Sequence, residues 1–152
     1  VICNVPATVT IPAGQYRIYF TVTGAGVGST TVTASASGYS ATQDLSVNVV
    51  TPQLNFSGPS NTTVGHMSNF NVHMTTPGAY YSGNQAAASA ISVNLTSSAP
   101  GVATVPSTTT IPAGSTSSNN TALTGVAVGT TTLTASGAGL SSATSGVITI
   151  NP

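Results

Sequence analysis

The chain repeats itself after about 100 residues, and this internal repeat restricts the folds that it can form. The tetrapeptide Ile-Pro-Ala-Gly at residues 11–14 recurs at residues 111–114. After a slip of one residue, the segment 28–35 (GSTTVTAS) is matched by 129–136 (GTTTLTAS). A fixed period of this kind indicates repeated structural units. The period is too long for a solenoid repeat and fits a β-sandwich domain of about 100 residues.

Alternating apolar residues and regularly spaced turn residues predict seven strands in the second copy of the repeat. The expected strands are 53–57, 68–75, 91–97, 105–111, 119–124, 129–136 and 145–151. Proline and glycine fall between them, where turns need these residues. The pattern predicts an all-β chain, an immunoglobulin-like two-sheet β-sandwich with about one and a half tandem repeats.

The same alternation assigns one face of each strand to the core. The residues expected to point inward are Phe70, Val72, Met74, Ile91, Val93 and Leu95 in the second copy, and Ile18, Phe20 and Val22 in the first. Thr121 and Leu123 take the places of Phe20 and Val22, which predicts a leaner core at that point of the second copy.

The alignment of the two copies divides the chain into residues 1–51 and 52–152. The second part is a complete repeat, whereas the first is the C-terminal half of one and has no counterpart of residues 53–97. Half a sandwich leaves apolar faces and strand edges open, which favours pairing with further strands. Either upstream residues of a long tandem array supply them, or a neighbouring subunit does. In the second case the head-to-tail contact produces a filament if it does not close.

The near-absence of charge excludes several functions. Arg17 is the only Lys or Arg, so a basic patch for nucleic acid cannot form. Asp44 is the only acidic side chain, which rules out paired-carboxylate catalysis and an acid-rich calcium loop. One cysteine and two histidines cannot build a four-ligand zinc site within one chain. We therefore expect no metal, no cofactor and no nucleic-acid partner.

The sequence also predicts that the protein is not an enzyme. Asp44, either His66 or His73, and a serine could in principle form a hydrolytic triad. No Gly-x-Ser-x-Gly motif positions a nucleophile, so no catalytic residue is assigned. Cys3 aligns with Ala103, which indicates a small buried side chain, with an intermolecular disulfide as the alternative. No apolar run is long enough to predict a membrane span.

One loop of the second repeat contains the adjacent pair Tyr80 and Tyr81. We expect these rings to pack in an interface with the glycine-rich turn that contains Gly24 and Val27, because buried aromatic rings would stiffen a joint between domains. The alternative is a binding tip, where the tyrosines stack on a carbohydrate or a protein.

Four asparagines begin Asn-x-Ser/Thr triplets and are candidate glycosylation sites: Asn55, Asn61, Asn94 and Asn119. In a chain so rich in serine, threonine and asparagine, several such triplets arise by chance. The alternative is that these are ordinary strand and turn asparagines.

The runs at residues 9–14, 20–24 and 28–36 resemble bacterial immunoglobulin-like (Big-type) repeats, and the likeness covers most of residues 5–50 and 102–151. Such repeats occur in tandem in adhesins, surface-layer-associated proteins and other secreted or cell-surface proteins. The resemblance therefore implies an immunoglobulin-like fold and an extracellular or cell-surface setting. Together with the half repeat, it predicts a structural module of a filament, stalk or surface layer, whose partners are copies of itself. The alternatives are an adhesin module that binds carbohydrate or a host surface through its loop tips, and an accessory domain of a secreted hydrolase.

Overall fold

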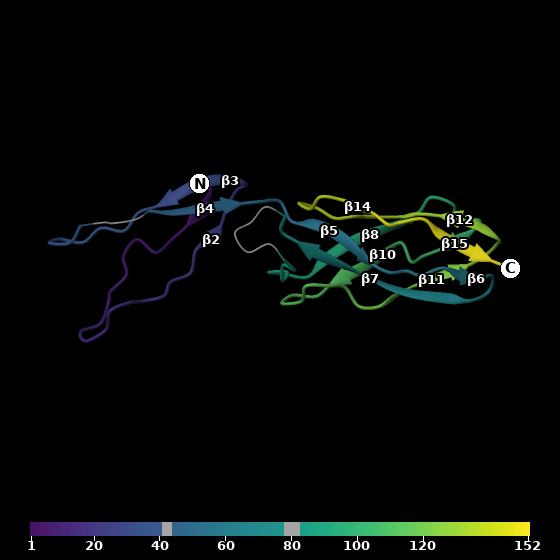
Figure 1. Ribbon diagram of the computed structural model, residues 1–152, viewed down its shortest axis with the longest axis horizontal. Coiled ribbons are helices and arrows are strands. Elements are labelled where there is room, and N and C mark those ends of the chain that lie inside the picture. Colours follow the sequence, from purple (N-terminus) through teal and green to yellow (C-terminus); the bar gives the residue numbers. More distant parts are fainter. Residues whose placement is uncertain (41–43, 78–82) are drawn as a thin grey trace. The chain divides into compact units, whose positions relative to one another are not determined.

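The computed structural model describes residues 1–40, 44–77 and 83–152, and every regular element among them is a β-strand (Figure 1). The chain divides into two compact units, Val1–Val50 and Thr51–Pro152, called unit 1 and unit 2 below. The predicted all-β fold class is confirmed. Within the described ranges, no helix is long and apolar enough to cross a membrane.

Unit 2 is built from strands that form a β-sandwich. Its strands are β5 (Gln53–Ser57), β6 (Thr62–Thr63), β7 (Met67–Thr75), β8 (Ile91–Ser97), β9 (Ala103–Thr104), β10 (Thr108–Ile111), β11 (Thr121–Gly125), β12 (Gly129–Thr131), β13 (Leu133–Ser136), β14 (Ala143–Thr144) and β15 (Ile148–Asn151). One sheet has the order β5-β7-β11-β9 and another β10-β8-β13-β14. A third has the order β12-β15-β6, and only Thr132 separates β12 from β13.

The seven strands predicted in residues 53–152 all have a counterpart in unit 2. The predicted strand 129–136 is interrupted by one residue, which separates β12 from β13. The short strands β9 and β14 lie just ahead of the predicted ranges 105–111 and 145–151, before β10 and β15. Strand β6 was not predicted. It pairs in parallel with β15 through Thr62 and Thr63, and two threonines in a turn-rich segment give no alternation from which a strand can be read.

Five of the six inward residues predicted for unit 2 lie in its core, and the sixth, Ile91, is half-buried and packs against it. Phe70, Val72 and Met74 of β7 are buried and face Val93 and Leu95 of β8 across the sandwich interior. The other strands complete this core with Leu54, Ile111, Leu123, Leu133, Ala135, Ile148 and Ile150. The predicted alternation is therefore confirmed here, because each of these strands has one covered and one open face.

Three buried hydroxyl side chains are hydrogen-bonded within this apolar core. Thr121 stands where the first copy has Phe20, and its hydroxyl donates to Thr109 Oγ1 at 3.0 Å. The Ser118 hydroxyl accepts from the Val72 amide at 3.0 Å, and the third group is the hydroxyl of Thr131. Among the described residues, no buried side-chain oxygen or nitrogen is left without a partner. The threonine-rich sequence can thus form a core without the cost of unsatisfied polar groups.

Unit 1 contains two short antiparallel ladders. Strand β1 (Cys3–Asn4) pairs with β2 (Thr23–Gly24), and β3 (Gly28–Val32) pairs with β4 (Leu45–Val49). None of the described residues of this unit is fully buried. The described apolar side chains of unit 1 are therefore at most half-buried.

The strand predicted around Ile18, Phe20 and Val22 is wrong for unit 1. Residues 17–22 form no ladder, and Ile18 and Phe20 are 40 % and 42 % exposed. In unit 2 the corresponding β11 pairs with β7, from Thr121 opposite Phe70 to Thr124 opposite Met67. The described part of unit 1 has no counterpart of β7. An alternating sequence becomes a strand only where a partner satisfies its backbone groups, and here that partner is missing.

Candidate functional site

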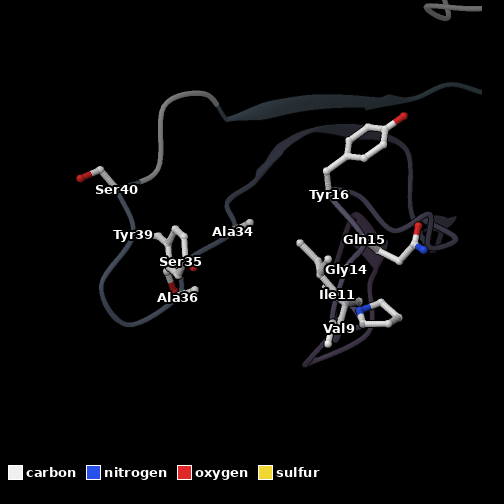
Figure 2. A pocket seen from close by; sticks show the side chains of 12 residues that line it. Val9, Ile11, Gly14, Gln15, Tyr16, Ala34, Ser35, Ala36, Tyr39 and Ser40 are labelled. Carbon is white, nitrogen blue, oxygen red and sulfur yellow. The ribbon is translucent and has the colours of Figure 1, made fainter.

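The described residues of unit 1 enclose an open cleft of about 830 Å³. Val9 and residues 11–16 form one wall, and residues 34–36 with Tyr39 and Ser40 form the other. Figure 2 shows the two groups of side chains facing each other across a gap. None of the lining side chains is charged. The cleft therefore offers apolar side chains and backbone amide groups to an occupant.

The corresponding residues of unit 2 show what such a space can hold. Ile111 and Ala135 match Ile11 and Ala34, and both are fully buried, whereas Ile11 is 53 % exposed. They belong to β10 and β13, which pair with the two edges of β8. In unit 2, therefore, the place between the two walls is filled by a single strand.

Several backbone pairings of unit 1 repeat those of unit 2. Cys3 lies opposite Gly24 as Ala103 lies opposite Gly125, and Gly28 lies opposite Val49 as Gly129 lies opposite Ile150. The carbonyl of Ile2 accepts from two successive amides, Ala25 at 2.8 Å and Gly26 at 3.1 Å. The carbonyl of Val102 does the same with Val126 at 2.8 Å and Ala127 at 3.2 Å. The cleft thus lies in a backbone framework that has the geometry of a sandwich.

An exposed aromatic group lies at the rim of the cleft and was not predicted as a site. The guanidinium carbon of Arg17 lies 5.2 Å from the ring centre of Tyr16 and 5.1 Å from that of Tyr19. Both tyrosines are strongly exposed. Such contacts at exposed positions contribute about 0.5–1 kcal/mol. The sequence did contain a signal for this group, because Arg17, the only Lys or Arg of the chain, lies between Tyr16 and Tyr19.

The residues considered for catalysis are distributed over both units. Asp44 belongs to unit 1, while His66 is exposed in a turn of unit 2 and His73 is half-buried on β7. No three His, Cys, Asp or Glu side chains gather into a possible metal site within the ranges that the structure describes. Cys3 is a half-buried free thiol on β1. We therefore base no catalytic proposal on these residues.

The predicted joint falls partly outside the described residues. Tyr80 and Tyr81 lie in the range that the structure does not describe. Gly24 ends β2, and a Cβ atom on it would meet the Val49 side chain at 3.0 Å. Val27 is exposed. An interface that joins these four residues stays a prediction.

The four candidate glycosylation sites differ in access. Asn61, Asn94 and Asn119 are exposed. The oxygen of the Asn61 side chain accepts from the Thr149 amide at 2.9 Å, which leaves its nitrogen available. Asn55 is half-buried, and its side-chain nitrogen donates to Thr75 Oγ1 at 2.8 Å. Because N-linked glycans are attached through that nitrogen, Asn55 is the least suitable of the four, and glycosylation stays a prediction.

No protein-family model matches this chain, and no curated protein matches it. Among solved structures, domains 4 and 5 of the S-layer protein SbsC align with 86 % of this chain and 69 % of theirs, at 19 % identity and a TM-score of 0.47. Domains 1–6 of SbsC align with 87 % of this chain, at 20 % identity and a TM-score of 0.48. A glycosyl hydrolase family 2 member from Bacteroides cellulosilyticus aligns with 88 % of it, at 14 % identity and a TM-score of 0.50.

This chain spans 17 % of that longer SbsC structure and 19 % of the hydrolase. At such low identity the likeness to the hydrolase concerns the fold alone. Together with the strand order of unit 2, it places the protein in the class of immunoglobulin-like β-sandwiches. The finer resemblance to Big-type repeats is matched by no family model.

Proposed function

We propose that this chain is a non-enzymatic structural module of an extracellular filament, stalk or surface layer, in which repeats are joined head to tail. In this arrangement, strands from outside residues 1–50 complete the half sandwich of unit 1. The observation that supports it best is the open cleft of unit 1, whose two walls are the unpaired counterparts of strands that are paired and buried in unit 2.

The energetics favour completion of unit 1. Four apolar side chains of unit 1 are exposed, namely those of Val9, Ile11, Ile18 and Phe20. The alternation of the sequence, or the match to unit 2, assigns each of them to a face that a complete sandwich covers. Full burial of one such side chain stabilises a fold by about 1.5–3 kcal/mol. Because these side chains are about half exposed, a partner that covers them gains part of this energy for each, which offsets part of the cost of ordering a strand. Val9 and Ile11 both line the cleft, and exposed apolar side chains that lie together are typical of an interaction surface.

The scarcity of charge supports a role within an assembly. Soluble monomers usually protect their sheet edges and surfaces with charged side chains, and only 1 % of this chain is charged. Covered surfaces do not need that protection. Glycans on the exposed Asn61, Asn94 and Asn119 would supply hydration to the faces that stay open. The resemblance of residues 5–50 and 102–151 to Big-type repeats supports a location outside the cell or on its surface.

The alternative, an adhesin module, depends on loop tips that present aromatic side chains. Tyr80 and Tyr81 lie outside the described residues. Tyr16, Tyr39 and Arg17 instead lie at or beside the rim of the cleft. We therefore favour a structural role over carbohydrate binding.

The proposal is tested on the protein purified without denaturation from the cells that make it. We expect it in the cell-surface fraction, as a polymer or sheet visible by negative-stain electron microscopy. The intact mass after full denaturation then separates the two modes of joining. A value near 14.8 kDa indicates separate subunits, and a value of many tens of kilodaltons indicates repeats within one polypeptide. Recovery as a dispersed cytoplasmic monomer would contradict the proposal.

A further inference from the structure

We infer that the cleft of unit 1 is an acceptor site for one β-strand, and that its occupant is an uncharged segment with the apolar alternation of β8. This inference rests on the proposed function and names the partner of the open half sandwich. In unit 2 the matching walls hold β8 between β10 and β13, and both pairings are antiparallel. The cleft of unit 1 lies between the counterparts of β10 and β13.

The register of the occupant follows from the pairings in unit 2. Ile111 lies opposite Ile91, Thr109 opposite Val93 and Ala135 opposite Leu95. Ile11, Val9 and Ala34 stand at the equivalent positions of unit 1. An occupant with Ile-x-Val-x-Leu spacing would therefore place its isoleucine opposite Ile11 and its leucine opposite Ala34. Five residues of extended chain span about 17 Å, so the site holds a strand segment and not a single side chain.

The backbone of both walls is suited to this pairing. Residues 8–11 and 33–35 belong to no ladder among the described residues, whereas their counterparts in unit 2 pair with β8. An added strand would satisfy amide and carbonyl groups on two edges at once. Because the lining side chains are uncharged, a strand with an inward charge would lose its hydration without a compensating partner.

The connection into unit 1 identifies the source of the strand. In unit 2, β8 leads through a short turn to Val102, and Ile2 makes the same pair of backbone contacts in unit 1. A segment of the sequence type of residues 52–101, entering directly ahead of Ile2 in the same polypeptide, would bring its strand into the cleft. A second copy of this chain fits less well, since its β8 is already paired on both edges and its withdrawal would open that copy's core.

A chain with a duplicated segment tests the inference. Residues 52–101 are placed directly ahead of Ile2, in place of Val1, and the rest of the sequence is kept. Hydrogen exchange is then compared with that of the unmodified chain. We expect the amides of residues 8–11 and 33–35 to become at least tenfold slower and to approach their counterparts at 108–111 and 134–136. Unchanged exchange at residues 8–11 and 33–35, with unit 2 protected in the same sample, would overturn the acceptor site.

Two substitutions in the duplicated chain test the register. Ile11→Asp would place a charge against the added strand, so we expect it to remove the new protection in unit 1. Thr10→Asp is the matched control, because its counterpart Thr110 is exposed in unit 2. We expect this variant to keep the protection. Equal behaviour of the two variants would overturn the proposed register.

Two further measurements test the source of the strand. A separate peptide of residues 52–101 is added to the unmodified chain, and the unmodified chain is also studied over a range of concentrations. We expect neither to protect residues 8–11. Protection by the peptide would assign the strand to a neighbouring subunit, and concentration-dependent protection would assign it to a second copy. Both results would overturn a source in the same polypeptide. The proposed function is judged separately, from the location and assembly of the natural material.

Discussion

The two units of this chain place nearly the same sequence in two different environments. Ile11 and Ile111 belong to the same tetrapeptide, yet the first is 53 % exposed and the second is fully buried. The turns agree as well, since Gly14 and Gly114 have φ values of 83° and 76°. The comparison teaches that local sequence is sufficient for turns and short ladders, whereas burial requires the strands that only unit 2 contains.

We expect the two units to differ most in how shortening their matched isoleucines changes the free energy of unfolding. Ile111→Ala removes a fully buried side chain, which should lower the free energy of unfolding of unit 2 by about 3 kcal/mol. Ile11→Ala should change it by less than about 0.5 kcal/mol, because Ile11 belongs to unit 1 and is half exposed. Urea unfolding followed by circular dichroism measures both. Equal losses would contradict the difference in burial between the two positions.

A smaller difference is expected for two matched glycines. A Cβ atom on Gly125 would lie 2.5 Å from the Thr63 carbonyl oxygen, so Gly125→Ala should destabilise unit 2 by about 2 kcal/mol through overpacking. A Cβ atom on Gly24 would contact only the Val49 side chain, at 3.0 Å, because unit 1 has no described counterpart of β6. We expect no loss of unit 2 stability from it. Thermal unfolding by calorimetry checks the pair, and a tolerated Gly125→Ala would contradict the close approach of β6.

The smallest difference concerns a buried hydroxyl. Thr131 Oγ1 lies 2.9 Å from Ser97 Oγ and accepts from the Ala99 amide at 3.2 Å. Thr131→Val keeps the shape and removes these bonds, which should cost about 1–2 kcal/mol. The matched change Thr30→Val, at a half-exposed position of β3, should be neutral within about 0.5 kcal/mol. Urea midpoints of the two variants give the comparison. A neutral Thr131→Val would show that the hydroxyl cluster adds nothing to stability.

The strands of unit 2 could be predicted from the sequence because its alternation is regular and its turns are marked. Phe70, Val72 and Met74 alternate with polar residues, and the structure buries all three. The same reasoning was wrong for residues 17–22, where Ile18 and Phe20 alternate as well. Alternation reports which face a strand would bury, but it does not report whether a neighbouring strand is there to pair with it.

The candidate site was predicted only in outline. The alignment indicated that residues 1–51 form half a repeat with open faces, a division that stays a prediction. It did not indicate that Ile11 and Ala34 would form two walls of one cleft, since 23 positions separate them in the sequence. That juxtaposition follows from the pairing of β3 with β4 and of β1 with β2. The contacts of Arg17 with Tyr16 and Tyr19 were missed because side-chain geometry decides them.

The sequence by itself determined the all-β class, the positions of the turns and the near-absence of charged side chains. These properties depend on residue type and local spacing, which the chain carries wherever it folds. Only the tertiary structure decided which alternating segments became strands, that β6 covers Gly125, and that a cleft separates residues 9–16 from residues 34–40. Each of these depends on whether a second segment is present to exclude water and satisfy backbone groups, and that is a property of the assembled sheets.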